Sequence, residues 1–231
     1  MSKTWEMFEI SLQTRLNNFE KYVRRQSLSR FIARYELFKL QMPIKGCIVE
    51  CGVHHGGGLM CWAKLSAAME PYALDRRIFG FDTFSGFPSI SDIDLSTLNS
   101  QAKVGEFSTN YDVYSELLEL IVEYDKNRYL NEFQKIYLVK GDACETIPLF
   151  LEKNPYILIS LLFLDFDLFE PTKIAIEYLL PRMPKGAILA FDELNNPWWP
   201  GETLAAVKCL NLNEKKINRF SFDPNISYIV L

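Results

Sequence analysis

Acidic residues and glycines recur directly after short apolar runs of this sequence. The places are Gly52, Asp82, the pair Gly141-Asp142, Asp165 and the pair Asp192-Glu193. Ligands of open α/β sheets bind at the carboxyl ends of parallel strands, so we expect these residues to face one crevice. Each residue alone is a weak signal, and the prediction rests on their convergence.

The segment Glu50–Gly58 predicts a glycine-rich turn between a strand and a helix, which lets a ligand approach the backbone closely. A dinucleotide-binding fingerprint would need glycine where this chain has His54. Glu50, two residues before Gly52, suits a ligand with an ammonium group, and S-adenosylmethionine has an amino group and a sulfonium. The alternative is a turn that only packs the helix on the strand. The residues of this turn expected to contact such a ligand are Glu50, Gly52, Val53, His54, Gly56 and Gly57.

Asp82 ends the second apolar run, about 30 residues after the glycine turn, and a carboxylate there can accept both hydroxyls of a ribose. Asp142, after the third run, could accept from the adenine amino group. The structural alternatives are a helix N-cap for Asp82 and an ordinary Gly-Asp turn for Asp142. The residues expected to contact the ribose and adenine of S-adenosylmethionine are Asp82, Thr83, Phe84, Ser85, Gly141 and Asp142.

Four carboxylates come from the ends of two further runs: Asp165, Asp167, Asp192 and Glu193. Asp165 and Asp167 alternate at a strand end, so a regular strand would send them to the same side. Such carboxylates repel one another unless a cation neutralises them, and all-oxygen ligation favours Mg²⁺ or Ca²⁺. The alternative is that they cap the helices that follow.

The chain begins with two amphipathic stretches, from Phe8 to Phe19 and from Leu28 to Leu40, which predict helices that stop at Pro43 and Gly46. Strand-like and helix-like segments then alternate. The predicted strands are Cys47–Cys51, Ile78–Phe81, Lys135–Val139, Ile157–Leu164 and Ala187–Phe191, with a final hairpin of Lys216–Phe222 and Ser227–Leu231. The predicted helices are Gly58–Met69, Tyr111–Tyr124, Pro171–Leu180 and Glu202–Leu210.

This alternation predicts an α/β fold with a parallel sheet covered on both faces and an antiparallel hairpin at its edge. The segment Phe87–Asn110 is long, polar and irregular, and we expect it to act as a lid over the crevice.

The chain has 231 residues, of which 48% are apolar and 23% charged, which excludes a disordered chain or a coiled coil. A net charge of -4 argues against a nucleic-acid partner. The five cysteines form no CxxC pair, and Cys47 and Cys51 lie in an apolar run, which favours buried reduced thiols. With no signal peptide and no apolar run long enough for a bilayer, we expect a cytoplasmic protein without a membrane partner.

In this order the motifs resemble the macrocin O-methyltransferase type of class I S-adenosylmethionine-dependent methyltransferase, whose members methylate sugar hydroxyls. The resemblance runs from about Arg24 to the C-terminus. The segments that carry it are Tyr35–Phe38, Val49–Val53 with Gly56-Gly57, Phe81–Pro88, Leu164–Thr172, and Phe191–Leu194 followed by Trp199–Thr203.

The resemblance implies a Rossmann-like sheet of seven strands, mostly parallel with a last antiparallel strand, and S-adenosylmethionine as the methyl donor. It implies a divalent metal, Mg²⁺, held by Asp165, Asp192 and Glu193, and a general base at Asp167. Asp165 is expected to contact the donor as well. Relatives often have a second aspartate at the position of Glu193, and a Trp-Arg pair in place of His54-His55.

We therefore expect residues 1–42 to form a helical extension or lid, and residues 43–231 to form the methyltransferase domain. Mg²⁺ at a sugar hydroxyl would lower its pKa, and Asp167 would take the proton before the oxygen attacks the sulfonium methyl. The expected partners are a small sugar or glycoside acceptor and a second copy of the chain in a homo-oligomer.

Three alternatives stay open at this point. Asp165-Phe166-Asp167 is also a DxD pattern, which is found in metal-dependent glycosyltransferases. A hydroxylase-type relative of the same fold and a non-catalytic binding module are the others. His54 and His55, the two histidines of the chain, are either exposed loop residues or include a proton acceptor near the ligand.

Overall fold

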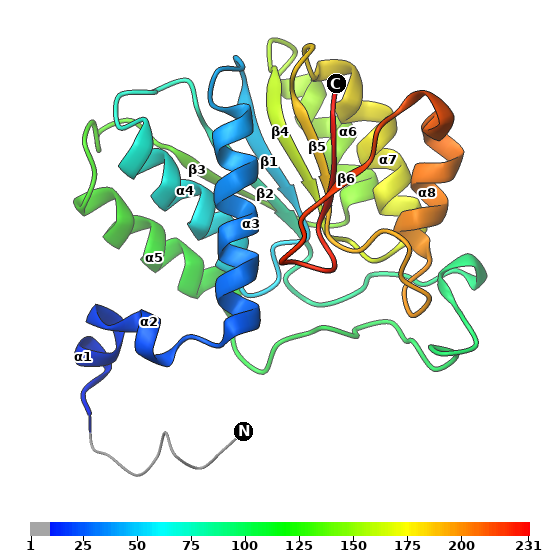
Figure 1. The fold of residues 1–231 in the computed structure, drawn as a ribbon, viewed down its shortest axis with the longest axis horizontal. Helices are drawn as coiled ribbons and strands as arrows, with labels where there is room; N and C mark the ends of the chain where they lie inside the picture. The colour runs from blue at the N-terminus through cyan, green and yellow to red at the C-terminus, as the bar shows by residue number, and fades with distance from the viewer. Residues whose placement is uncertain (1–9) are drawn as a thin grey trace.

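A seven-stranded sheet forms the centre of the computed structural model, which describes residues 10–231 (Figure 1). Its strand order is β3-β2-β1-β4-β5-β7-β6, with β1 to β5 parallel and β7 antiparallel to both β5 and β6. The predicted fold class is thereby confirmed. The strands are β1 (Cys47–Cys51), β2 (Ile78–Asp82), β3 (Ile136–Lys140), β4 (Ile159–Leu164), β5 (Ile188–Phe191), β6 (Asn218–Arg219) and β7 (Ser227–Val230).

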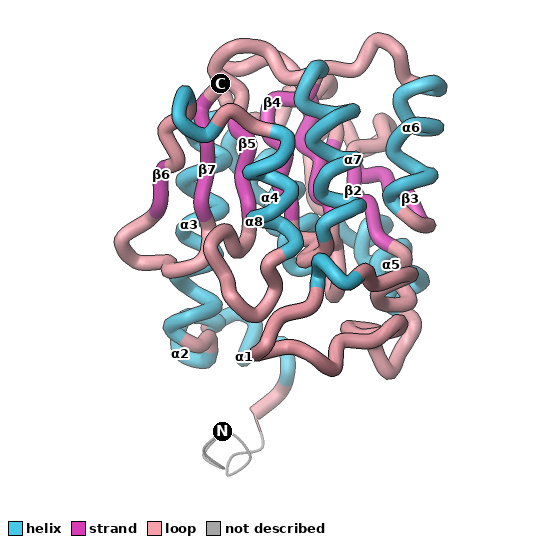
Figure 2. Tube along the Cα trace, turned by 90° about the vertical axis from the view of Figure 1, so that its right-hand side faces the viewer, coloured by secondary structure: helices cyan, strands magenta, loops and turns pink. Residues whose placement is uncertain are grey.

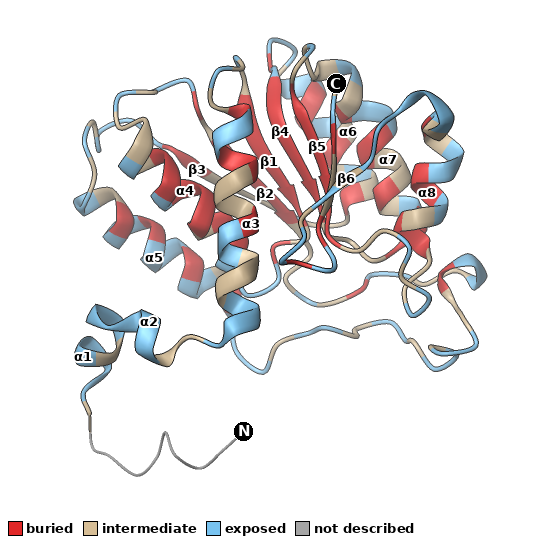
Figure 3. Ribbon diagram, viewed as in Figure 1, coloured by how far each residue is buried: buried red, intermediate tan, exposed pale blue. Residues whose placement is uncertain are grey.

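The central strands β1, β4 and β5 are buried along their whole length (Figure 3). Helices cover both faces there, so these strands are near-continuous apolar runs, whereas the edge strand β3 is only partly buried. In β1, Cys47 and Cys51 are buried free thiols, as their apolar surroundings predict.

Helices cover the two faces in two groups of three. The side chains of α3, α4 and α5 pack on one face with Ile48 and Phe163, and those of α6, α7 and α8 pack on the other with Val49 and Leu162. Figure 1 shows the two groups on either side of the sheet. The helices are α1 (Leu12–Asn17), α2 (Phe19–Tyr22), α3 (Arg25–Gln41), α4 (Gly57–Met69), α5 (Val113–Lys126), α6 (Ala143–Lys153), α7 (Phe169–Leu179) and α8 (Gly201–Cys209).

The N-terminal helices divide into an exposed pair and a core helix. α1 and α2 bury no residue, whereas α3 contributes Ala33, Leu37 and Phe38 to the core. Phe8, where the first predicted stretch begins, lies outside the described residues. The domain boundary after residue 42 and the lid role of the segment before it stay predictions.

Helix α6 was missed by the sequence analysis, which left the chain between its third and fourth strands unassigned. Pro148 lies inside this helix and removes one backbone donor, which usually ends a helix. Here Ile147, Phe150 and Leu151 are all buried, and that packing outweighs the lost hydrogen bond. The last hairpin is also shorter than predicted, because β6 spans only Asn218–Arg219.

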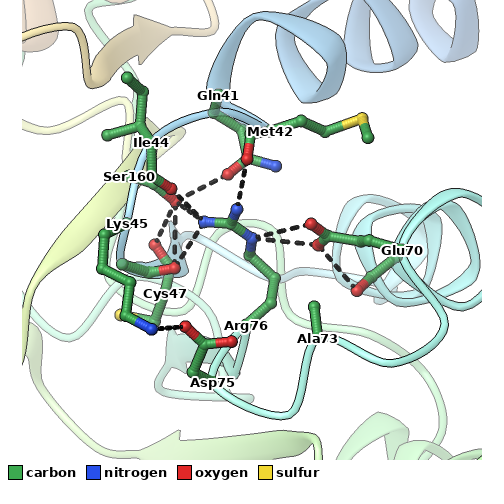
Figure 4. A network of polar contacts seen from close by, with 12 residues as sticks. Gln41, Met42, Ile44, Lys45, Cys47, Glu70, Ala73, Asp75, Arg76 and Ser160 are labelled. Carbon is green, nitrogen blue, oxygen red and sulfur yellow. Dashed lines mark hydrogen bonds and ion pairs between the residues drawn. The ribbon is translucent and has the colours of Figure 1, made fainter.

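Arg76 lies just before β2 and ties the last residues of α3 to the sheet (Figure 4). Its guanidinium donates to three carbonyls of the turn 42–46, to Ser160 Oγ at 2.7 Å, and to Glu70 at 3.0 Å. The amino ends of β1 and β4 are thus fixed to the C-terminal end of α3. The N-terminal half of α3 then lies beside the opposite, carboxyl edge of the sheet, where the loops gather (Figure 1).

The segment between η2 (Asp92–Asp94) and α5 runs across the carboxyl edge of the sheet (Figure 2). It overlaps a longer loop, residues 87–106, whose ends are joined by backbone hydrogen bonds from Phe87 N to Glu106 O and from Gly105 N to Phe87 O. None of the helices within residues 10–231 combines the length and apolar composition that crossing a bilayer requires.

Candidate active site

The carboxyl ends of the parallel strands border a cavity of about 320 Å³. The structure brings the five predicted places together here, although what they bind stays a prediction. The predicted residues that line the cavity are Gly52, His54, Asp82, Thr83, Phe84, Gly141, Asp142, Asp165, Asp167, Asp192 and Glu193.

Two glycines of the turn after β1 are required by packing. Gly52 has φ +90°, and a Cβ there would lie 1.9 Å from the carbonyl oxygen of Asp165. Gly56 has φ +81°, and its Cβ would lie 2.3 Å from Leu117 Cδ2 on α5. The packing role that was the alternative for this turn is therefore present, and Gly52 lines the cavity as well.

Glu50 points away from the cavity, into the layer between the sheet and α4. A Cβ at Gly58 would lie 2.0 Å from Glu50 Oε1, so the glycine makes room for this carboxyl. Burial raises the pKa of Glu50 to about 7, against the opposing charge of Arg34. The predicted donor residues that do not line the cavity are Glu50, Val53, Gly56, Gly57 and Ser85.

Asp82 organises two loops through its carboxylate. Oδ2 accepts from the backbone N–H groups of Val53 at 2.7 Å and His54 at 2.8 Å, and Oδ1 accepts from Phe84 N at 2.6 Å. A carboxylate has about four acceptor sites, so these three bonds leave it room for about one more. The predicted pairing with both ribose hydroxyls thus exceeds the free capacity of Asp82 in this arrangement.

Asp142 begins helix α6, where its carboxylate accepts from Cys144 N at 2.9 Å. The turn-and-cap alternative is therefore present at this residue. Asp142 also lines the cavity beside Gly141, at the end of β3.

Asp165, Asp167, Asp192 and Glu193 form what we call the acidic group. It lies where β4 and β5 end side by side, with Leu164 paired to Phe191. The two aspartates do not lie in a regular strand, because β4 ends at Leu164 and Asp167 has φ +62° in the loop beyond. Both side chains nevertheless line the cavity.

Burial and neighbouring acidic groups raise the pKa values of Asp165 and Asp167. The pKa of Asp165 is raised well above its usual range by burial and then by Asp192. The pKa of Asp167 is raised by burial and by a hydrogen bond with Glu193. Asp167 lines the cavity, so its carboxyl can hold or accept a proton there.

Arg30 enters the acidic group from helix α3, and the sequence analysis missed it. Its Nη2 donates to Asp192 Oδ1 and lies 3.5 Å from Asp165 Oδ2. An arginine in an amphipathic helix carries no signal of its own, since only the packing of α3 on the sheet brings it to the strand ends.

Glu202, in the first turn of α8, is a second residue that was missed. It is fully buried, and its pKa is raised by burial and by Asp192. Its Oε2 accepts from Glu193 N at 3.3 Å, while Oε1 has no hydrogen-bond partner among the described residues. The position reads as an ordinary helix-start glutamate in the sequence.

The group fits a divalent metal in its chemistry but not yet in its arrangement. All donors are carboxylate oxygens, as Mg²⁺ prefers, and Glu193 Oε1 is buried without a partner, as is Oε1 of Glu202. Within residues 10–231, however, no three acidic, histidine or cysteine side chains gather around one point. Arg30 lies between Asp165 and Asp192 instead.

Three aromatic rings line the cavity as a cluster, which we call the aromatic wall. Phe87, Phe107 and Trp199 lie with ring centroids 5.1 to 5.6 Å apart and all line it. His54 approaches Phe107 with its ring at 6.1 Å. No local sequence pattern predicts this cluster, because Phe107 and Trp199 come from loops far apart in the sequence.

The two histidines differ in their surroundings. His54 lines the cavity, and its pKa is lowered by burial and by the neighbouring His55. His55 turns to Tyr111, with Nδ1 at 2.9 Å from the phenol oxygen.

The strand order with its antiparallel β7, and the loops with carboxylates at the carboxyl edge, define a methyltransferase fold and an enzyme of that class. The sequence matches the macrocin-O-methyltransferase (TylF) family over residues 23–198, and the chain belongs to that family.

Two solved structures of CalS11 resemble the chain over 99% of its length. The calicheamicin methyltransferase CalS11 has 34% sequence identity and a TM-score of 0.93, with 89% of its own chain covered. The apo structure of CalS11, described as a TDP-rhamnose 3'-O-methyltransferase, has 31% identity and a TM-score of 0.84, with 90% covered.

The O-methyltransferase NovP shares the fold at 18% identity and a TM-score of 0.67, over 87% of this chain and 79% of its own. No match was found among curated proteins.

Proposed function

We propose that the protein is an S-adenosylmethionine-dependent O-methyltransferase that methylates a hydroxyl of a sugar. The observation that carries this is one cavity in which a glycine turn and Asp82 lie beside Asp165, Asp167 and Asp192. The family and the sugar substrate in the description of CalS11 support the acceptor class.

The donor is assigned to the side of the cavity formed by β1, β2 and β3. Asp82 accepts one ribose hydroxyl there, and Asp142 faces the adenine, while Gly52 lets the donor lie against the backbone. The donor is cationic, and the lining carboxylates favour it electrostatically. Glu50 is assigned no contact with the donor, because its carboxyl is buried behind the glycine turn.

The acceptor is assigned to the other side, between the aromatic wall and the acidic group. Phe87, Phe107 and Trp199 offer apolar faces on which the C–H face of a sugar ring can pack, while Asp167 accepts the proton of the reacting hydroxyl. Holding donor and acceptor in one cavity supplies much of the rate through positioning.

Asp165, Asp192 and Glu193 are proposed to hold Mg²⁺, with Glu202 behind them. A divalent cation there would lower the pKa of a bound hydroxyl. We expect EDTA to abolish methyl transfer and Mg²⁺ to restore it. Full activity in metal-stripped protein would contradict the metal assignment and leave His54 as the preferred base.

The proposal extends to the cell compartment and the assembly of the enzyme. The absence of a disulfide among the five cysteines, all within the described residues, suits the reducing cytoplasm. Exposed apolar residues on α1 and α5, among them Leu12, Leu16 and Val122, suit a homo-oligomer. A small-molecule acceptor, with no nucleic acid or membrane, completes the proposal.

Calorimetry separates this function from a metal-dependent glycosyltransferase with the same DxD pattern. The protein is titrated with S-adenosylhomocysteine and, separately, with a nucleotide sugar in the presence of Mg²⁺. The proposal expects S-adenosylhomocysteine to bind on its own. Binding of the nucleotide sugar alone, with release of free sugar or glycoside, would favour the glycosyltransferase.

A further inference from the structure

Among the described residues that line the cavity, Arg30 is the one arginine or lysine. Six carboxylates line the same cavity. Arg30 reaches the site from helix α3, which is held at its far end by Arg76. Its side chain is 28% exposed and lines the cavity.

One guanidinium nitrogen of Arg30 contacts both Asp192 and Asp165. Nη2 of Arg30 donates to Asp192 Oδ1 and lies 3.5 Å from Asp165 Oδ2. These two carboxylates are also the proposed metal ligands from adjacent strand ends. An ion shared by Asp165 and Asp192 would have to lie between them, where the guanidinium nitrogen now lies.

We propose that Arg30 is the resident counter-ion of the metal-free enzyme and that a divalent cation binds by displacing its guanidinium from between Asp165 and Asp192. This inference rests on the proposed function for the identity of the incoming cation. The exchange occurs by side-chain rotation, because the C-terminal end of α3 is fixed to the sheet.

Besides Asp192 and Asp165, the carboxyl of Asp223, a buried residue of the loop between β6 and β7, favours the positive charge of Arg30. Metal affinity in this enzyme is therefore set by a competition between two cations for the same carboxylates. Glu193 and Glu202, whose Oε1 atoms have no partner among the described residues, gain from the incoming ion.

The test measures Mn²⁺ binding, by electron paramagnetic resonance of the free ion, in three proteins: wild type, Arg30→Met and Lys39→Met. Lys39 is an exposed residue of the same helix that pairs with Glu36, so it controls for the loss of one positive charge. We expect Arg30→Met to bind Mn²⁺ at least about tenfold more tightly, which is about 1.4 kcal/mol. Lys39→Met should match the wild type.

An unchanged or weaker Mn²⁺ affinity in Arg30→Met would overturn the proposal, as would an equal gain in Lys39→Met. If Arg30→Met does not fold, the wild type carries the test through the side-chain NMR signals of its arginines. Millimolar Mg²⁺ should shift the Arg30 guanidinium signal, and a signal that stays unchanged would overturn the exchange.

Titration of the same proteins with S-adenosylhomocysteine keeps the two proposals apart. A wild type that does not bind S-adenosylhomocysteine would refute the methyltransferase function. The role of Arg30 is decided by the Mn²⁺ affinities alone.

Discussion

The backbone N–H of Phe169 donates to Asp94 Oδ1 at 2.6 Å, although the two residues are 75 positions apart in the sequence. Phe169 begins α7, directly after the loop that holds Asp167. The other carboxylate oxygen of Asp94 accepts from the backbone and hydroxyl of Ser91 at 3.0 and 2.6 Å. A buried aspartate thus joins the predicted lid to the loop of the proposed base.

Asp94→Ala should weaken the anchoring of the predicted lid, residues 87–110, without changing the binding of the methyl donor. We expect faster protease cleavage between residues 87 and 110, and a higher KM for the acceptor with nearly unchanged affinity for S-adenosylhomocysteine. Asp92→Ala, an exposed neighbour in the same short helix, is the control. Cleavage of Asp94→Ala at the wild-type rate would show that Asp94 does not anchor the segment. In the wild type, cleavage should slow when donor and acceptor are both bound.

Asp82→Ala tests the donor assignment. It should weaken S-adenosylhomocysteine binding by about 1–3 kcal/mol, because a hydrogen bond to a charged acceptor is lost. The variant also loses three bonds to Val53, His54 and Phe84, so its melting temperature should fall as well. Calorimetry is therefore done below the melting temperature measured for the variant. Wild-type affinity in folded Asp82→Ala would refute the assignment.

Glu50→Gln tests the burial of a carboxyl behind the glycine turn. The folded-state pKa of Glu50, about 7, lies above its ordinary value of 4.5, so the folded protein binds this proton more tightly than the unfolded chain does. The contribution of Glu50 to stability therefore falls as the pH rises from about 4.5 to 7. We expect the melting temperature of Glu50→Gln, relative to wild type, to rise over that window and to level off above it. Glu119→Gln, on an exposed face of α5, should show no such trend; a flat difference for Glu50→Gln would contradict the raised pKa.

Arg76→Met tests the network that fixes α3. Removing one partner of a buried ion pair leaves Glu70 uncompensated and frees the carbonyls of the turn 42–46, so we expect a loss of about 3–5 kcal/mol in the free energy of unfolding. Lys45→Met removes the exposed pair with Asp75 and should change stability by about 0–1 kcal/mol. Chemical denaturation measures both, and equal effects would show that Arg76 has no special role.

The sequence predicted the sheet and the meeting of its strand ends because these depend on local patterns. Apolar runs such as Ile159–Leu164 define buried strands, and parallel strands bring their carboxyl ends to one edge. The glycine turn and the acidic residues were found by the same logic.

The sequence could not predict contacts that depend on how distant elements pack. Arg30 reaches Asp192 across 162 positions, and Asp94 reaches Phe169 across 75. The burial of Glu50 followed from the room that Gly58 leaves in α4, which no strand-end rule contains. Helix α6 was missed because Pro148 interrupts the helical pattern of apolar residues. The helix forms because Ile147, Phe150 and Leu151 are buried against the rest of the protein.

The most direct test of the account is transfer of a labelled methyl group from S-adenosylmethionine to a panel of nucleotide sugars and glycosides with Mg²⁺, comparing wild type with Asp167→Asn. We predict that the wild type methylates a sugar hydroxyl. Asp167→Asn should bind S-adenosylhomocysteine as the wild type does but lose about 10²–10⁴-fold in rate, the contribution of a general base. An Asp167→Asn enzyme that transfers methyl at the wild-type rate, or a wild type that methylates no member of the panel, would contradict it.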